Sequence, residues 1–532
     1  MNKQYDVLIM GGGLAGLTLA IQLKRRLESL KILIIEKASH PAPEAAHKVG
    51  ESSVEIASHY FEKVLGLEQP LENELPKLGL RFFYSDQNNQ DITKRVELGP
   101  YHFPPAKSYQ LDRGRFENAL AKQCTQLGID FQDNTKVKQI HLAKHAHQLD
   151  LDQNGEIQTV QGKWLIDASG RMALLKRHLK LARPAYHDIN ASWFRIAHEI
   201  NIDQWTDDKQ WQDRVAAPRR LSTNHLMGHG YWVWLIPLAS GATSIGIVAD
   251  AKIHPYAEIN TFARAQTWLA KHEPQCAAMI EQHKAQLQDF LTLKHYSHNC
   301  KQMYSADGWA ITGDAGVFLD PFYSPGSDFI ALNNTFISEL IVQQQTGNDI
   351  SPAVKQYEKL FRTLFIAFCP VYEDQYPIMG NAKVMSIKII WDYTLYWSGA
   401  ALLFFRDKFC DIEFMNANSQ FLQRIYQLNI KMQAFFRHWA ELDHSSDALN
   451  DVFINYSNIQ FLQQLNKDLL QEQNDAQISQ QLSDNIALIA ELSNEIIVQA
   501  VSDCEPLAAH APATQTQSSD YLHDVFNLFK PA

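Results

Sequence analysis

The chain has 532 residues, of which 45% are hydrophobic and 20% charged, and its formal net charge is -11 at pH 7. This length exceeds what one hydrophobic core usually serves, so two or three structural units are expected. The acidic balance argues against nucleic acid as a partner, because phosphate binding needs a surplus of lysine and arginine. The six cysteines form neither a CxxC pair nor another spacing typical of metal ligands. This pattern favours a reduced, cytoplasmic setting.

The N-terminal segment combines a strand, a glycine turn, a helix and an acid. Residues 5–10 predict a strand with no export signal before it, and residues 17–27 predict a helix. A second predicted strand, over 31–36, ends at Glu36. The glycines between the first strand and the helix are Gly11, Gly13 and Gly16. Such glycines permit a tight turn, the helix N-terminus receives a pyrophosphate and the acid accepts a ribose hydroxyl. The pattern predicts a Rossmann-like dinucleotide-binding unit.

Two later segments also predict a strand that ends in a tight turn with an acid. They cover residues 164–170 and 309–316, and the second contains Asp314. Either segment alone could be only a tight turn. Together with the N-terminal unit, they indicate a cofactor domain assembled from separated stretches.

The remaining chain divides into a β-rich insertion and a helical region. Strand patterns such as 231–237, followed by a predicted helix over about 258–288, indicate an inserted substrate domain at about 180–300. After about residue 350 the composition favours helices. We therefore expect an α/β fold with a cofactor module over 1–345, which includes the insertion, and a helical C-terminal region over 346–532.

One apolar segment of the helical region needs an explanation. Residues 384–405 are aromatic and apolar but contain Lys388 and Asp392, and charges inside a membrane span are costly. A buried helix pair is the favoured interpretation, and a helix associated with a membrane is the alternative. Residues 506–519 have the composition of a surface linker.

Two features of the first 345 residues have both an ordinary and a functional interpretation. Lys77 lies on a predicted apolar strand, where a lysine usually keeps its stem packed and its ammonium in water. Trp232 and Trp234 are two residues apart on a predicted strand and therefore face the same side. Such a pair forms either a plain core layer or the wall of a pocket.

These motifs, in this order, resemble those of the flavin-dependent halogenases, the tryptophan-halogenase-like group within the FAD-dependent monooxygenase class. The resemblance covers residues 1–345. Besides the glycine turn, it rests on segments 48–52, 76–82, 110–116, 232–237 and 313–326. The glycine turn and the Gly-Asp-Ala element are shared by many flavoproteins, so the tryptophan string and Lys77 are its specific signals.

The resemblance implies a role for each matching residue. FAD would be held by Gly11, Gly13, Gly16, Glu36, Gly50, Glu51, Ser52, Arg113, Asp314 and Gly326. A wall between flavin and substrate would be formed by Trp232, Trp234 and Pro237, with Tyr323 near it. Halide would attack a flavin peroxide near Ser324, and Lys77 would receive the hypohalous acid. That lysine would act as a hydrogen-bond donor or as an N-haloamine.

The chain departs from the family pattern at the Ser324 turn. Indole-directed members carry a glutamate where this chain has Tyr323, so a phenolic, pyrrolic or other electron-rich ring is favoured, delivered free or on a carrier protein. Pro325 has no N–H and Asp328 adds an anion, so fewer donors remain for a halide.

The leading hypothesis is FADH2-dependent halogenation of an aromatic small molecule with chloride or bromide. A single dinucleotide fingerprint agrees with a separate flavin reductase as the source of FADH2. The first alternative is an FAD-dependent monooxygenase or dehydrogenase without halide chemistry, which the Ser324 turn favours. The second is a non-catalytic flavin-binding protein whose helical region docks a partner or a membrane.

Overall fold

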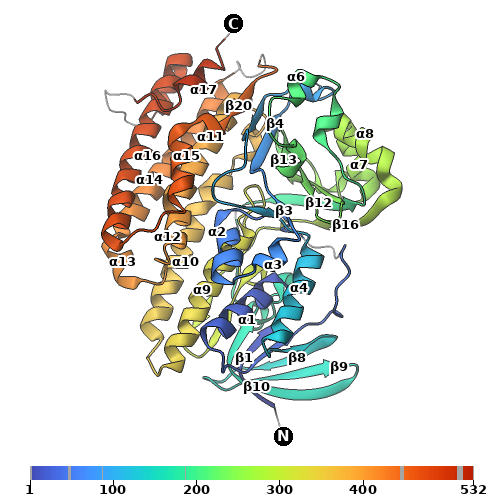
Figure 1. The fold of residues 1–532 in the computed structure, drawn as a ribbon, viewed down its shortest axis with the longest axis vertical. Helices are drawn as coiled ribbons and strands as arrows, with labels where there is room; N and C mark the ends of the chain where they lie inside the picture. The colour runs from blue at the N-terminus through green and yellow to red at the C-terminus, as the bar shows by residue number, and fades with distance from the viewer. Residues whose placement is uncertain are drawn as a thin grey trace. The chain divides into compact units, whose positions relative to one another are not determined.

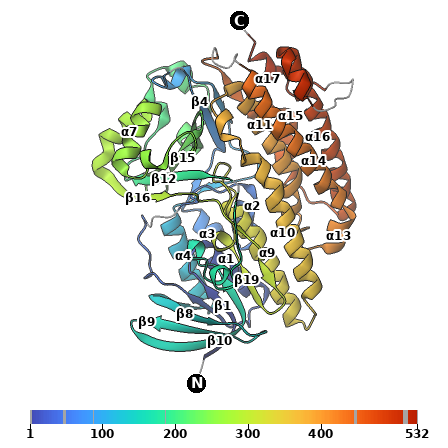
Figure 2. The same cartoon turned by 180° about the vertical axis from the view of Figure 1, so that it is seen from behind.

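A computed structural model of the chain describes residues 3–45, 49–86, 88–185, 187–443, 449–511 and 519–530. Lys48, the first residue of the 48–52 motif, lies outside them. The chain forms two compact units, which Figures 1 and 2 show from opposite sides. Unit 1 comprises Met1–Leu75, Leu111–Tyr186 and Tyr296–Ile366, and unit 2 comprises Pro76–Gln110, His187–His295 and Ala367–Ala532.

Unit 1 is built on a mixed sheet whose central strands are parallel. The main strand order is β18-β19-β10-β1-β2-β7, and β8 and β9 extend it from β10. Residues Val7 to Met10 are an unbroken apolar run because this strand is covered on both faces. The strands are β1 (Lys3–Met10), β2 (Ile32–Ile35), β7 (Asp130–Gln132), β8 (Thr135–His141), β9 (His147–Gln153), β10 (Glu156–Asp167), β18 (Tyr304–Ser305) and β19 (Trp309–Ile311).

A buried asparagine fixes the helices of unit 1 to one another. Asn334 of α9 donates to the Ala15 carbonyl (3.1 Å) and the Thr18 hydroxyl (3.0 Å) of α1, and accepts from Thr312 (2.8 Å). Because its amide is fully used, it sets the register of α1 against α9. The helices are α1 (Leu14–Arg26), α2 (Glu55–His59), α3 (Glu68–Leu71), α4 (Arg113–Gln126), α5 (Leu174–His178), α9 (Gly326–Gln345) and α10 (Ser351–Tyr372), which runs on into unit 2.

Unit 2 contains an eight-stranded sheet in the order β16-β12-β15-β14-β13-β4-β5-β20. One face packs Phe194, Val233 and Ile247 against α7 and α8, and C-terminal helices lie on the other side (Figure 1). The strands are β4 (Leu80–Tyr84), β5 (Glu97–Gly99), β12 (Ile189–Ile196), β13 (Thr223–Gly228), β14 (Tyr231–Pro237), β15 (Thr243–Asp250), β16 (Leu287–Leu293) and β20 (Phe453–Asn455).

The C-terminal helices cluster with this sheet, and β20 pairs with β5 in a parallel register. The sheet and these helices therefore share unit 2. Its helices are α6 (Lys209–Gln212), α7 (Phe262–His272), α8 (Pro274–His283), α11 (Ala382–Leu395), α12 (Leu402–Phe405), α13 (Ile412–Ala417), α14 (Ser419–Leu442), α15 (Gln460–Asp468), α16 (Asp475–Asp503) and α17 (His523–Asn527).

Three local expectations differ from the structure. The helix expected over 258–288 is two helices, because Pro274 cannot continue α7 and instead begins α8. Residues 384–405 lie in one buried helical run rather than a helix pair. Within this run, Lys388 and Asp392 form an ion pair of 2.6 Å. Lys77 lies between two strands, β3 (Leu75–Pro76) and β4, rather than on one. Among the described residues, no helix is long and apolar enough to cross a membrane.

Candidate functional site

The glycine turn after β1 packs tightly at Gly11, Gly12 and Gly16 and leaves space at Gly13. Gly11 has a φ of +119°, and a Cβ there would overlap the Ala168 carbonyl. A Cβ on Gly16 would overlap the Gly11 carbonyl, so α1 sits directly on the turn. A Cβ on Gly13 would meet nothing closer than 3.9 Å, although the residue begins the helix. The space therefore lies where a ligand of the helix N-terminus would be bound.

The polar groups around this turn fit a dinucleotide. The N-terminus of α1 has no side-chain cap and no acid in its first turn, so its N–H groups face the open position. Glu36 accepts hydrogen bonds from the N–H groups of Gly12 (2.7 Å) and Ala38 (2.8 Å), which holds its carboxylate beside the turn. These residues suit a pyrophosphate and a ribose hydroxyl, the two groups by which FAD is usually held.

Arg113 fixes the turn that contains Gly50, Glu51 and Ser52. Its Nη1 donates to the carbonyls of Val49 (2.8 Å) and Gly50 (3.1 Å). Gly50 has a φ of +89°, which favours glycine, and a Cβ there would crowd the guanidinium. Glu51 and Ser52 are buried. The role of Arg113 in the structure is thus to position this turn on α4.

Asp314 lies in a short helical turn after β19, near three positively charged side chains. Gly313 before it has a φ of +60°, and the Thr312 N–H donates to the Asp167 carbonyl at 2.9 Å, which joins the two predicted turns. Burial raises the pKa of the Asp314 carboxyl, and the positive charges of Arg171, Arg113 and Lys176 oppose that rise. Both predicted acid-bearing turns therefore meet in unit 1.

The turn before α9 has an unusual backbone. Ser324 has a φ of +59°, a strained value for a residue other than glycine, and its N–H donates to the Pro321 carbonyl at 2.9 Å. Tyr323 is partly buried, and a Cβ on Gly326 would meet no atom within 4 Å. The Asp328 carboxylate accepts the Ala57 N–H at 2.9 Å. That bond directs one carboxylate oxygen to α2, so the acid has a structural partner outside the turn.

Lys77 is buried in unit 2. Its residue is 2% exposed, and its N–H donates to the Ser108 carbonyl at 2.9 Å. The neighbouring Leu78 N–H donates to the Leu221 carbonyl at 2.9 Å. The loop 77–79 is therefore bound on both sides by segments distant in sequence, and the ammonium does not have the solvated environment of an ordinary surface lysine.

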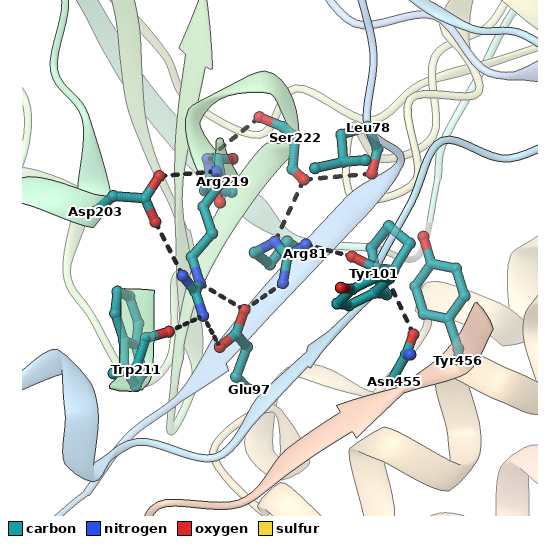
Figure 3. A network of polar contacts seen from close by, with 12 residues as sticks. Leu78, Arg81, Glu97, Tyr101, Asp203, Trp211, Arg219, Ser222, Asn455 and Tyr456 are labelled. Atoms are coloured by element: carbon teal, nitrogen blue, oxygen red, sulfur yellow. Dashed lines mark hydrogen bonds and ion pairs between the residues drawn. The ribbon is translucent and has the colours of Figure 1, made fainter. Parts of the chain in front are cut away.

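A buried charge network supports this loop (Figure 3). Glu97 forms an ion pair with Arg81 and accepts from Arg219 Nε (2.8 Å) and Nη2 (3.1 Å). Arg219 also pairs with Asp203 at 2.9 Å. The Ser222 hydroxyl accepts from Arg81 and donates to the Leu78 carbonyl, each at 3.3 Å. The sequence does not predict this network, because no local spacing links its members.

Trp232 and Trp234 lie on the same face of β14, as the spacing of two predicts. Their ring centroids are 5.7 Å apart. Trp232 donates through Nε1 to the Tyr376 hydroxyl at 2.9 Å, and Trp234 lies over Gly246 and donates to Ser244 at 3.2 Å. Pro237 ends the strand. Trp232, Trp234 and Pro237 belong to unit 2, as Lys77 does, whereas the glycine turn, Glu36, Asp314 and the Ser324 turn belong to unit 1.

A family model described as FAD binding domain matches residues 4–273. The chain belongs to this FAD-binding family. The flavin-dependent halogenase chlA of Dictyostelium discoideum is 28% identical over 432 residues, which cover 74% of this chain and 70% of the relative. A 1H-pyrrole-2-carbonyl-(peptidyl-carrier protein) brominase of Pseudoalteromonas luteoviolacea is 26% identical, and the match covers 65% of this chain and 79% of the relative.

Solved structures agree with this membership. The crystal structure of halogenase PltM in complex with phloroglucinol and FAD superposes with a TM-score of 0.60 at 15% identity, covering 95% of this chain and 98% of that one. At this identity the likeness establishes the fold. The family model and the sequence relatives support a place for the chain among the flavin-dependent halogenases, with an FAD-binding Rossmann-type domain.

Proposed function

We propose that the chain halogenates an electron-rich aromatic ring with hypohalous acid that Lys77 holds. The observation that carries this proposal is the burial of Lys77, at 2% exposure, in a chain of the FAD-binding family. A lysine removed from water is either a buttress with a fixed partner or a group with a chemical task. The loop that bears it is held through its backbone by the carbonyls of Ser108 and Leu221, so a fixed segment presents the amine, as the second role requires.

Bound FAD, once reduced, supplies the reducing equivalents that let oxygen oxidise a halide. In our proposal the chain's own residues hold the cofactor through the α1 N-terminus and Glu36, and Arg113 and Asp314 shape its surroundings. The single fingerprint agrees with FADH2 delivered by a separate flavin reductase. Such a reductase is a second partner in the proposal.

Chloride or bromide would bind at the N-terminus of α9. Pro325 contributes no N–H, so the donors in this proposal are the backbone amides of Gly326 and the residues after it. The open space at Gly326 supports it. Because one Asp328 oxygen accepts from Ala57, the acid is less of an obstacle to an anion than the sequence alone indicates.

Lys77 would hold hypohalous acid by donating a hydrogen bond to its oxygen, or would carry the halogen as an N-haloamine. In the hydrogen-bonded form, the ring takes the halogen and loses a proton, and the hydroxide of the acid leaves as water. The wall of Trp232, Trp234 and Pro237 would keep the organic substrate away from the cofactor. A phenolic or pyrrolic ring is the proposed substrate class, and the pyrrole brominase among the relatives supports delivery on a carrier protein.

The test replaces Lys77 by methionine, which keeps the apolar stem and removes the amine. Reduced FAD, oxygen and bromide are supplied with 1,3,5-trihydroxybenzene, and brominated product is measured by mass spectrometry. We expect product with the unchanged chain and none with Lys77→Met, at unaltered FAD affinity. The matched control is Lys107→Met, since Lys107 is an exposed lysine beside Ser108 and should retain full activity.

A second candidate is an FAD-dependent monooxygenase or dehydrogenase without halide chemistry, which Pro325 favours because it removes one donor from the α9 turn. The same assay separates the two. Hydroxylated product that forms without bromide and does not need Lys77 would replace our proposal by this one.

A further inference from the structure

Trp397 has a buried polar atom that the fold does not satisfy. The residue is 4% exposed, and its indole Nε1–H has no hydrogen-bond partner among the described residues. Tryptophan can only donate, so an acceptor atom of the protein, a water or a ligand is needed to satisfy this group. Leaving a donor buried without a partner destabilises the folded state. An acceptor on a bound molecule would remove that cost.

The backbone that carries Trp397 is also irregular. Between α11 and α12 the helical run widens into a π-helical segment, Tyr396–Ala401. A π turn inserts one residue into a helix and thereby rotates the side chains that follow, and such turns are frequent at functional sites. The Ser398 carbonyl within it accepts a hydrogen bond from the buried Asn485 of α16 at 2.9 Å. The irregular turn thus has a dedicated partner that holds its geometry.

A row of aromatic rings leads from Trp397 to the loop that bears Lys77. The Tyr393 ring lies 5.1 Å from Trp397 and 5.5 Å from Tyr456. Tyr456 donates to the Leu80 carbonyl at 3.3 Å, and a Cβ on Gly79 would overlap its hydroxyl. Gly79 is two residues from Lys77 in the same loop. All of these residues belong to unit 2, so the row is a feature of a single compact unit.

Trp439 provides a useful contrast. Its Nε1–H is also buried without a partner among the described residues. Its ring neighbours are Phe435, Phe526 and the Lys383 ammonium, none of which belongs to the row that leads to Lys77. It lies in the regular helix α14. An unpaired indole alone therefore does not indicate a site, but the π turn and the aromatic row distinguish Trp397.

We propose that Trp397 positions the aromatic substrate by donating its indole N–H to an acceptor oxygen on the ring, with Tyr393 and Tyr456 as the apolar wall. The inference rests on the proposed function, because it takes the Lys77 loop as the place where the ring reacts. It narrows the substrate to an arene with an oxygen acceptor, such as a phenol, an aryl ether or an aryl carbonyl. It also assigns the helical C-terminal region a part in substrate recognition.

The test compares two probes with the same 1,3,5-substitution pattern. 1,3,5-Trimethoxybenzene offers three acceptors and no donor, and 1,3,5-trimethylbenzene offers neither. Their dissociation constants are measured by calorimetry on the FAD-loaded chain, on Trp397→Phe and on Trp439→Phe. We expect Trp397→Phe to weaken binding of the trimethoxy probe by about tenfold, the effect of one hydrogen bond. Trp439→Phe should stay within about twofold, and neither variant should change binding of the trimethyl probe.

Equal effects of the two variants on the trimethoxy probe, or no binding of it to the unchanged chain, would overturn the inference. Bromination of trimethoxybenzene by the unchanged chain is measured in parallel. Product formation with equal variants refutes the role of Trp397 and leaves the proposed function intact. Selective weakening without any product refutes the halogenase proposal and leaves the binding site intact.

A second measurement needs no variant and covers the case in which Trp397→Phe does not fold. In a crystal structure of the unchanged chain with 1,3,5-trimethoxybenzene, a methoxy oxygen within hydrogen-bond distance of Trp397 Nε1 supports the inference. A probe bound elsewhere overturns it.

Discussion

Replacing Glu97 by leucine should strongly destabilise unit 2. Glu97 is 1% exposed and is the shared counter-ion of two guanidinium groups whose side chains are fully buried. It accepts two bonds from Arg219 and one from Arg81. Burial already lowers the pKa of Arg81, and the neighbouring Arg219 lowers it further. Without Glu97, Arg81 would lose its carboxylate partner in this network and Arg219 would retain only Asp203.

The magnitude follows from the burial of the network. Breaking a buried ion pair by removing one partner costs about 3–5 kcal/mol, because the remaining charge stays desolvated. An exposed pair contributes about 1 kcal/mol or less. Arg214 and Asp451 form such a pair, with side chains 27% and 47% exposed, and Asp451→Asn is the matched control because asparagine also tolerates the φ of +57° at this position. We therefore expect Glu97→Leu to lower the free energy of unfolding by about 3–5 kcal/mol and the control by about 1 kcal/mol at most.

The assay is urea denaturation followed by far-ultraviolet circular dichroism, with Arg81→Met and the double variant Arg81→Met, Glu97→Leu alongside. The double variant removes one charge of each sign and leaves the Arg219–Asp203 pair, so it should recover more than half of the loss. A loss no larger than that of Asp451→Asn, or a double variant as unstable as the sum of its two changes, would refute the reasoning.

Three further predictions concern unit 1. Gly16→Ala should lower the free energy of unfolding by about 3 kcal/mol or more, because its Cβ would overlap the Gly11 carbonyl. Thermal unfolding measures this. Gly13→Ala should leave stability nearly unchanged but weaken FAD binding at least tenfold by flavin fluorescence titration, because its methyl group would occupy the ligand's space. Burial and the Asp112 charge raise the pKa of Glu74 from 4.5 to about 8, against a hydrogen bond from the Asp112 N–H. The folded state then keeps a proton that the unfolded chain loses, so this contribution to stability is complete below pH 4.5 and is lost as the pH rises to about 8. Glu74→Gln should flatten the urea midpoint across that range, and an unchanged slope would contradict the assignment.

The sequence by itself determined the elements whose causes are local. The strand, glycine turn, helix and acid of residues 5–36 follow each other directly. The close contacts that require glycine at positions 11 and 16 are made within that stretch or with the residue that follows β10. The alternation on β14 likewise places Trp232 and Trp234 on one face whatever packs against them. These patterns were sufficient to predict an FAD-binding α/β fold of the halogenase type.

Only the tertiary structure decided which distant residues share a buried environment. Glu97 and Arg219 are 122 residues apart, and β4 pairs with β13 although more than a hundred residues separate them. The same holds for Trp397, because nothing in the amino-acid sequence around it distinguishes it from other buried tryptophans. Local sequence periodicity reports which side of an element faces the core, whereas the partner of a buried charge or N–H depends on how separate segments pack. The charge network bonded to the Lys77 loop and the unpaired indole of Trp397 can therefore be recognised only in the folded chain.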